Sequence, residues 1–227
     1  MHQQLFNMFI SKCIAHRVNE LNDEIAERIF KDADGIEFDI RDSNGELIVH
    51  HDAFAKPETC QLFDDFLEHC PTDKLYIVNV KAEGIEERVI AALTKRGIHN
   101  FFLLDCGLPA MYKLSQKGER RLAIRFSEYE SLETVRLMKD RVQWVWVDVF
   151  SVLPLTTQSI QQIRDWGLKI CLVSPELQGQ QDKMLQYKHY LSEIGTSPLD
   201  AVCTKEWNIE SWRACSNTAV STGEGTM

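Results

Sequence analysis

The regular alternation of short apolar runs with amphipathic segments is the feature that most restricts the fold of this chain. Eight such runs begin near residues 12, 35, 75, 101, 122, 144, 169 and 201, and each is followed by a helical or connecting segment. A series of β-α units with apolar strands predicts a parallel sheet covered by helices. Eight units favour a closed (β/α)8 TIM barrel of the α/β class over an open sheet.

The helical segments carry apolar residues at a spacing of three or four, and several end at a glycine. We expect helices over residues 20–33, 61–70, 85–96, 109–116, 132–139, 157–166 and 180–194, with a short one near 209–212. The strand that begins at residue 35 is followed by a turn at 42–45 and a return strand at 46–49. We predict one barrel domain over residues 1–215 and a disordered tail over residues 216–227, which are small and polar.

Charge and cysteine content restrict the partners and the compartment. The 25 basic and 34 acidic side chains give a formal net charge of −9, which argues against a nucleic-acid or anionic-membrane surface. Seven scattered cysteines without a C-x-x-C pair suggest reduced thiols of a cytoplasmic protein. Residues 5–10 make a poor signal peptide, and no apolar run approaches the roughly 20 residues of a membrane span. We therefore expect no stable membrane insertion.

The stretch over residues 35–52 gives the first indication of chemistry. Glu37 and Asp39 stand two apart in a β-like run, so both carboxylates leave the same face of the strand. Two carboxylates among apolar neighbours repel each other and are costly to bury without a compensating cation. A hard divalent cation with oxygen ligands would compensate them. A solvated hairpin with a polar rim explains the same residues equally well at this point.

Polar residues also gather where the predicted strands end. They are His16, Arg17, Glu37, Asp39, Asn79, Lys81, Asp105, Arg125, Ser127, Asp148, Ser174 and Lys205. The carboxyl ends of barrel strands form the mouth at which active sites of this fold lie. So many polar groups at one mouth predict a functional site there. Arg125 either faces this mouth or forms a structural ion pair with Asp148.

Three short motifs, in order along the chain, resemble a known family. His16-Arg17, Glu37-x-Asp39 and His51-Asp52 are similar to the H-R, E-x-D and H-D signature of the glycerophosphodiester phosphodiesterases. That family belongs with the phosphatidylinositol-type phospholipase C barrels. A weaker similarity extends through residues 79–81, 125–129 and 173–177.

The resemblance implies a role for each matching residue. His16 and His51 would be the acid/base pair, Glu37 and Asp39 would bind Mg²⁺ or Ca²⁺, and Arg17 would hold the phosphate. Lys81 and Arg125 are further candidates for binding the substrate. Imidazoles with a pKa near 6.5 suit both proton transfers of phosphodiester cleavage, and basic side chains suit the phosphoryl charge. The expected substrate is a small or lipid-derived glycerophosphodiester. His50 would point to the opposite face of the strand.

Asn79 departs from the family pattern, which reads E-x-K at this strand and uses the glutamate as the third metal ligand. An amide oxygen binds Mg²⁺ or Ca²⁺ without contributing charge, so the cation should be held less tightly. Glu83, two residues beyond Lys81, is a further candidate ligand. Three alternatives follow: a weaker metal site, an enzyme of the metal-free phospholipase type, or a catalytically silent barrel that binds a phosphorylated ligand or a partner protein.

Overall fold

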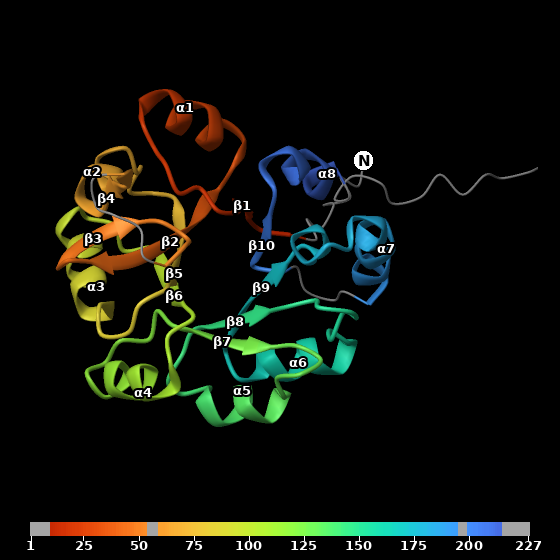
Figure 1. Ribbon diagram of the computed structural model, residues 1–227. Coiled ribbons are helices and arrows are strands. Elements are labelled where there is room, and N and C mark those ends of the chain that lie inside the picture. The colour runs from red at the N-terminus through yellow and green to blue at the C-terminus, as the bar shows by residue number, and fades with distance from the viewer. Residues whose placement is uncertain (1–9, 54–58, 195–198, 215–227) are drawn as a thin grey trace, which may run out of the picture.

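Eight parallel strands form one curled sheet in the computed structural model, which describes residues 10–53, 59–194 and 199–214 (Figure 1). In the order in which they pair, the strands are β6 (Phe101–Leu104), β5 (Leu75–Val80), β2 (Gly35–Ser43), β1 (Cys13–Ala15), β10 (Ala201–Thr204), β9 (Lys169–Val173), β8 (Trp144–Val147) and β7 (Ala123–Phe126). The prediction of a parallel α/β sheet from eight apolar runs is confirmed.

The two ends of this sheet, β6 and β7, meet at one point. An isolated parallel bridge joins Leu103 to Leu122, and the Leu103 N–H donates to the Arg121 carbonyl at 2.9 Å. Between β2 and β5, by contrast, the ladder runs over six residue pairs. No such ladder joins β6 to β7 in the described part of the chain, so the prediction of a closed barrel is confirmed only in part. We call this single contact the β6/β7 seam.

Eight helices lie on the outside of the curled sheet (Figure 1). They are α1 (Asp23–Asp32), α2 (Phe63–Glu68), α3 (Glu86–Lys95), α4 (Leu108–Gln116), α5 (Leu132–Met138), α6 (Thr157–Asp165), α7 (Met184–Ile194) and α8 (Ile209–Ala214). The Asn22 side chain caps α1 by accepting from the Ile25 N–H. Among the described residues, no helix combines the length and the apolar character needed to cross a membrane.

A hairpin extends β2 beyond the sheet, as the sequence predicts. Strand β3 (Glu46–Val49) returns antiparallel to β2 through Asn44 and Gly45, whose φ angles are +54° and +88°. Two consecutive positive φ angles are typical of the two-residue turn that matches the twist of a hairpin. The hairpin brings the chain back past Asp39 and towards His51, because the His50 N–H donates to the Asp39 carbonyl at 3.0 Å.

Buried side chains form two layers, one between sheet and helices and one on the inner side of the sheet. Ile14, Phe102 and Trp144 belong to the inner layer, and the rings of Phe102 and Trp144 stack with centroids 4.6 Å apart. Because side chains alternate along a strand, residues two positions beyond such inner residues also face inward. This alternation places polar side chains at the carboxyl ends of the strands above an apolar floor. The predicted tail lies outside the described residues, and the single-domain boundary stays a prediction.

Candidate active site

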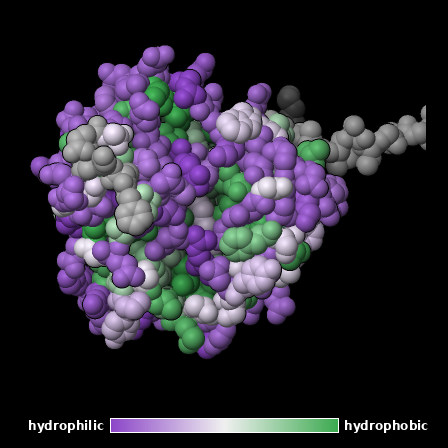
Figure 2. Space-filling view, viewed as in Figure 1, coloured by the Kyte–Doolittle hydropathy of each residue, from purple (hydrophilic) through white to green (hydrophobic). Residues whose placement is uncertain are grey.

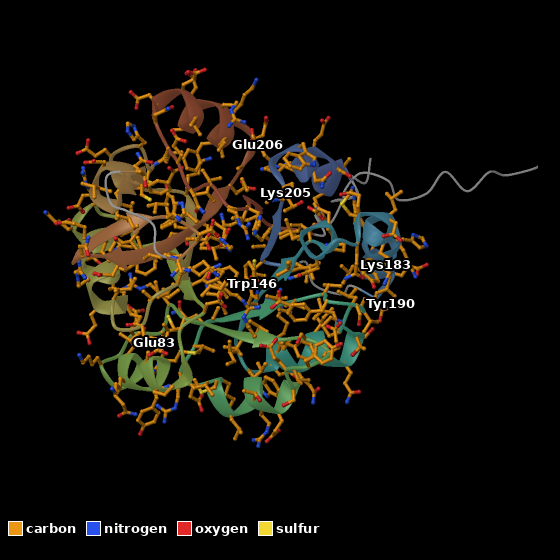
Figure 3. All side chains as sticks on the ribbon, in the orientation of Figure 1. Glu83, Trp146, Lys183, Tyr190, Lys205 and Glu206 are labelled. Carbon is orange, nitrogen blue, oxygen red and sulfur yellow. The ribbon has the colours of Figure 1, made fainter. Side chains whose placement is uncertain are left out.

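A cavity of about 480 Å³ lies at the carboxyl ends of the strands. Hydrophilic side chains gather around the centre of this face in Figure 2, and Figure 3 shows Trp146 near the centre of the ring of strands. Six of the eight predicted site residues line the cavity: His16, Arg17, Glu37, Asn79, Lys81 and Arg125. Asp105, Glu130, Trp146 and Asp148 line it as well. Asp39 and His51 are not among the lining residues, and Glu83 lines a separate surface depression.

Glu37 is buried beneath the cavity, with 2% of the residue exposed. Its Oε1 accepts from the Asn79 side-chain amide at 3.0 Å, and its Oε2 accepts from the Arg17 backbone N–H at 2.7 Å. Burial, together with the negative charge of Asp39, raises the pKa of the Glu37 carboxyl to about 7. Two positions on the same face of β2 therefore hold acidic side chains, and the charge of Asp39 disfavours ionisation of Glu37.

Asp39 is held by Asn19, a residue that the sequence analysis missed. The Asn19 side-chain amide donates to Asp39 Oδ2 at 2.8 Å, and the Asp39 backbone N–H donates back to Asn19 Oδ1 at 2.8 Å. Lys81 Nζ lies 3.6 Å from Asp39 Oδ1, and Arg17 Nε lies 3.9 Å from Asp39 Oδ2. Asn19 follows β1 in an irregular segment, where neither a spacing of apolar residues nor a sequence motif identifies it as a site residue.

His16 lies between the carboxylates and Lys205, which the sequence placed at the strand ends without assigning it a role. Its Nε2 is 3.7 Å from Glu37 Oε2, and its Nδ1 is 3.3 Å from Lys205 Nζ. Burial, and then the positive charges of Lys205 and Arg17, lower the pKa of the His16 imidazole to about 3. The ring is therefore neutral at neutral pH, as a proton acceptor must be. Lys205 directly follows β10, two positions after the inward-facing Cys203. The alternation of side chains along the strand therefore indicates that Lys205 faces inward.

His51 lies in the exposed segment after the hairpin. Its side chain is 40% exposed, and its Nδ1 is 2.8 Å from Asp52 Oδ1. His51 is close enough for its charge to contribute to the lowered pKa of His16. The expectation that the two imidazoles face each other across a phosphate stays a prediction. His50 Nδ1 accepts from the Asp52 backbone N–H at 3.0 Å.

Asp105 joins two of the predicted phosphate-binding cations. Its Oδ2 is 3.2 Å from Lys81 Nζ, and its Oδ1 accepts from Arg125 Nε at 2.9 Å. Arg125 also pairs with Asp148, so the structural ion pair exists and the guanidinium still lines the cavity. Asp105 has a φ of +62° and Arg17 a φ of +55°, a region that non-glycine residues seldom adopt. Such strain is concentrated at functional sites.

The residues around Glu37 offer oxygen atoms to a divalent cation. The two carboxylates at Glu37 and Asp39 carry like charge in a buried setting, and Asn79 Oδ1 is buried without a hydrogen-bond partner. Carboxylate and amide oxygens are the ligands that Mg²⁺ and Ca²⁺ take in proteins. Two features oppose a cation here: Asn79 is neutral, and Lys81 already lies beside Asp39. Within the described residues, no group of three or more His, Cys, Asp or Glu side chains is arranged to hold a metal ion.

Comparisons with known proteins bear on the fold. No family model and no curated protein matches the sequence. Solved structures do match. A glycerophosphodiester phosphodiesterase from Thermotoga maritima has a TM-score of 0.61 at 18% identity, over 93% of this chain and 98% of that one. One from Agrobacterium tumefaciens has a TM-score of 0.60 at 17% identity, over 85% and 96%. A putative one from Galdieria sulphuraria has a TM-score of 0.67 at 15% identity, over 91% and 99%.

The chain has the fold of the glycerophosphodiester phosphodiesterases. At 15–18% identity this similarity concerns the arrangement of the chain, and the activity must be argued from the site. The fold agrees with the family that the His16-Arg17 and Glu37-x-Asp39 motifs resemble. In a glycerophosphodiester phosphodiesterase fold, the cavity at the strand ends is the expected place for chemistry.

Proposed function

We propose that the protein is a phosphodiesterase that hydrolyses a glycerophosphodiester or a related small or lipid-derived phosphodiester. The observation that carries this proposal is the convergence of His16, Arg17, Glu37, Lys81 and Arg125 on one cavity at the strand ends. A neutral imidazole can transfer protons in phosphodiester cleavage, and several cations can stabilise the phosphoryl charge.

In this proposal the basic residues hold the phosphate, and the histidines move the protons. Arg17 and Lys81 donate to the phosphate oxygens, and Arg125 contributes its guanidinium beside Lys81, since both contact Asp105. His16 and His51 form the acid/base pair: one takes a hydroxyl proton and the other protonates the leaving alkoxide. Lys205 orients the His16 ring by its contact with Nδ1.

Glu37, Asp39 and Asn79 would hold a Mg²⁺ or Ca²⁺ ion, bound weakly because Asn79 brings no charge. When bound, the cation supplies positive charge that stabilises the phosphoryl group. The buried amide oxygen of Asn79 and the raised pKa of Glu37 support this assignment. A cytoplasmic location, inferred from the cysteine content, is part of the same proposal.

Replacing the histidines tests the proposal. His16→Ala and His51→Ala should each lower kcat for a glycerophosphodiester by about 10²–10⁴, because each removes a proton-transfer group. The measurement is the rate of alcohol release from glycerophosphocholine with Mg²⁺ or Ca²⁺ in excess. His189→Ala is the matched control, since that imidazole is 76% exposed on α7, outside the cavity lining. Full activity in both active-site variants would reject the acid/base assignment.

A catalytically silent barrel that binds a phosphorylated ligand is the second candidate. Asn79 favours it, because a neutral amide stands where a third carboxylate would complete the metal site. This alternative predicts that wild type binds a phosphate ester measurably but releases no alcohol from any phosphodiester under the same conditions. Turnover that depends on His16 would eliminate it.

A further inference from the structure

A second cavity, of about 560 Å³, lies beside the candidate active site where the β6/β7 seam leaves the sheet almost unpaired. Its apolar wall is formed by Leu108 and Met111 of α4 and by Ala123 and Ile124 of β7. The volume falls within the range of about 300–1,000 Å³ that is typical of small-molecule sites. We call it the seam cavity.

The seam cavity borders the candidate active site. Asp105, Arg125 and Glu130 line both cavities, so one guanidinium stands at their border. Tyr129 lines the seam cavity and Phe150 lines the active-site cavity, and their ring centroids are 6.1 Å apart. A phosphate bound by Arg125 would therefore have one of its substituents next to the apolar wall.

The charges in the seam cavity select the kind of substituent. Arg125 is the one cation among the described lining residues, and the phosphate would take it, while Asp105 and Glu130 place two carboxylates on the same wall. A second anionic group would meet these carboxylates without a free cation among the lining residues. A neutral hydrocarbon chain instead covers Leu108, which is 53% exposed, and is itself removed from water, which is favourable in proportion to the apolar area buried.

We propose that the seam cavity binds the alkyl chain of a lipid-derived phosphodiester while Arg125 holds the phosphate. This inference rests on the proposed phosphodiesterase function and specifies its substrate class. It assigns Leu108, Met111, Ala123 and Ile124 as residues that determine specificity. The missing ladder between β6 and β7 is then the feature of the fold that makes room for the chain.

The affinity of n-alkyl phosphates tests the seam cavity without requiring turnover. Calorimetric titration with methyl, propyl, butyl and hexyl phosphate, each below its aggregation concentration, should give affinities that rise about 2- to 4-fold per methylene, since a buried methylene is worth about 0.8 kcal/mol. The rise should stop when the cavity is filled. An affinity that does not change from methyl to hexyl phosphate would overturn the inference.

Two variants locate the effect. Leu108→Asp places a charge on the apolar wall at a position that is 53% exposed, and the ratio of hexyl to methyl phosphate affinity should fall close to one. Ala123→Leu fills the cavity from β7 and should shorten the chain length at which the affinity stops rising. Leu185→Asp is the matched control, because Leu185 is 72% exposed on α7 outside the cavity lining and should retain the wild-type ratio. An unchanged ratio in Leu108→Asp would place the alkyl chain elsewhere.

Turnover separates this inference from the proposed function. The same alcohols, esterified to glycerol phosphate, serve as substrates. Two results together would overturn the alkyl site: equal kcat/KM for the methyl and hexyl esters, and an affinity for alkyl phosphates that does not change with chain length. The phosphodiesterase proposal would still stand. Binding that strengthens with chain length, without hydrolysis of any ester, supports the alkyl site and rejects the phosphodiesterase proposal.

Discussion

At the scale of single residues, Asn79 decides how strongly the site attracts a cation. Its amide nitrogen donates to Glu37, and its Oδ1 is buried without a partner. Asn79→Glu adds a negative charge at this position, and the affinity of oxygen-ligand sites rises with ligand charge. We expect calorimetric titration of Mg²⁺ or Ca²⁺ to give at least about tenfold tighter binding in the variant than in wild type.

Asn79→Gln is the control for this comparison, because it changes the length of the side chain and leaves it neutral. It should not tighten cation binding. If Asn79→Glu binds the cation no better than Asn79→Gln, residue 79 is not at the metal position. Glu37 and Asp39 would then be the remaining candidate ligands, without Asn79.

Asp148 should make the stability of the protein depend on pH. Burial, opposed by the charge of Arg125 and reinforced by that of Glu130, raises the pKa of the Asp148 carboxyl from 3.8 to about 6. Between these values the folded state retains a proton that the unfolded state has lost, so stability falls as the pH rises through this window. At about 1.36 kcal/mol per pKa unit, the loss between pH 4 and pH 7 is up to about 3 kcal/mol.

Urea unfolding of wild type and Asp148→Asn at pH 4 and pH 7 measures this effect. The variant has no proton to lose at this position, so its stability should fall less than that of wild type over the same interval. Comparing how the free energy of unfolding changes with pH in the two proteins cancels the contribution of the other titrating groups, including Glu37. Parallel slopes in the two proteins would show that Asp148 titrates with an ordinary pKa.

At the scale of elements, Gly35 is required at the start of β2 for close approach of the neighbouring strand. A Cβ at this position would lie 1.8 Å from the Leu75 carbonyl oxygen and 3.1 Å from Ile14 Cδ1. Because the first of these atoms belongs to the backbone, the β2–β5 ladder must shift to accommodate any side chain. Gly35→Ala should lower the free energy of unfolding by about 3 kcal/mol, measured in urea.

Gly107→Ala is the matched control for Gly35→Ala. Gly107 precedes α4 with a φ of −60°, and the nearest atom to an added Cβ is Pro109 Cδ at 3.8 Å. Its stability should stay within about 0.5 kcal/mol of wild type. A Gly35→Ala variant as stable as Gly107→Ala would mean that β2 and β5 are not packed as described.

Helices and strands with a clear spacing of apolar residues were predictable from the sequence. Elements whose bounds depend on contacts between residues far apart in the chain were not. The runs predicted to begin near residues 101 and 201 became strands that begin at Phe101 and Ala201. The helix expected from residue 61 begins only at Phe63, because the Gln61 side chain bonds both backbone groups of Leu21 and holds β4 (Gln61–Leu62) extended. The helix expected over 180–194 is divided into a 3₁₀ turn, Gln181–Lys183, and α7.

The same distinction applies to the candidate site. His16, Glu37 and Lys81 were predictable because strand parity and motif order both mark them. Asn19 was not, since its role depends on the position of Asp39 twenty residues later in the chain. The β6/β7 seam likewise has no local signal: the run over 122–126 is apolar except for Arg125, and nothing in it indicates how few hydrogen bonds it makes to β6.

At the scale of the whole molecule, the seam predicts where the sheet opens first. Strand β2 has neighbours on both sides, β1 and β5, whereas within residues 10–53, 59–194 and 199–214 β6 has a ladder only to β5 and β7 only to β8. Strands with fewer hydrogen bonds open at lower free energy. In hydrogen exchange under native conditions, peptides covering β6 and β7 should exchange about tenfold faster than those covering β2 and β5, which corresponds to about 1.4 kcal/mol.

Hydrogen exchange in the presence of hexyl phosphate tests whether the strands that open first also form the proposed alkyl site. An alkyl chain bound in the seam cavity contacts β7 and α4. Because ligand binding stabilises the closed state of these elements, hydrogen exchange should slow in peptides covering β7 and α4 and stay unchanged in those covering β2. Methyl phosphate, which lacks the chain, should slow exchange at the seam less. Equal protection of all eight strands without ligand would mean that a full ladder joins β6 to β7 in solution. The sheet would then be a closed barrel, and the cavity that we assign to the alkyl chain would lose the gap on which it depends.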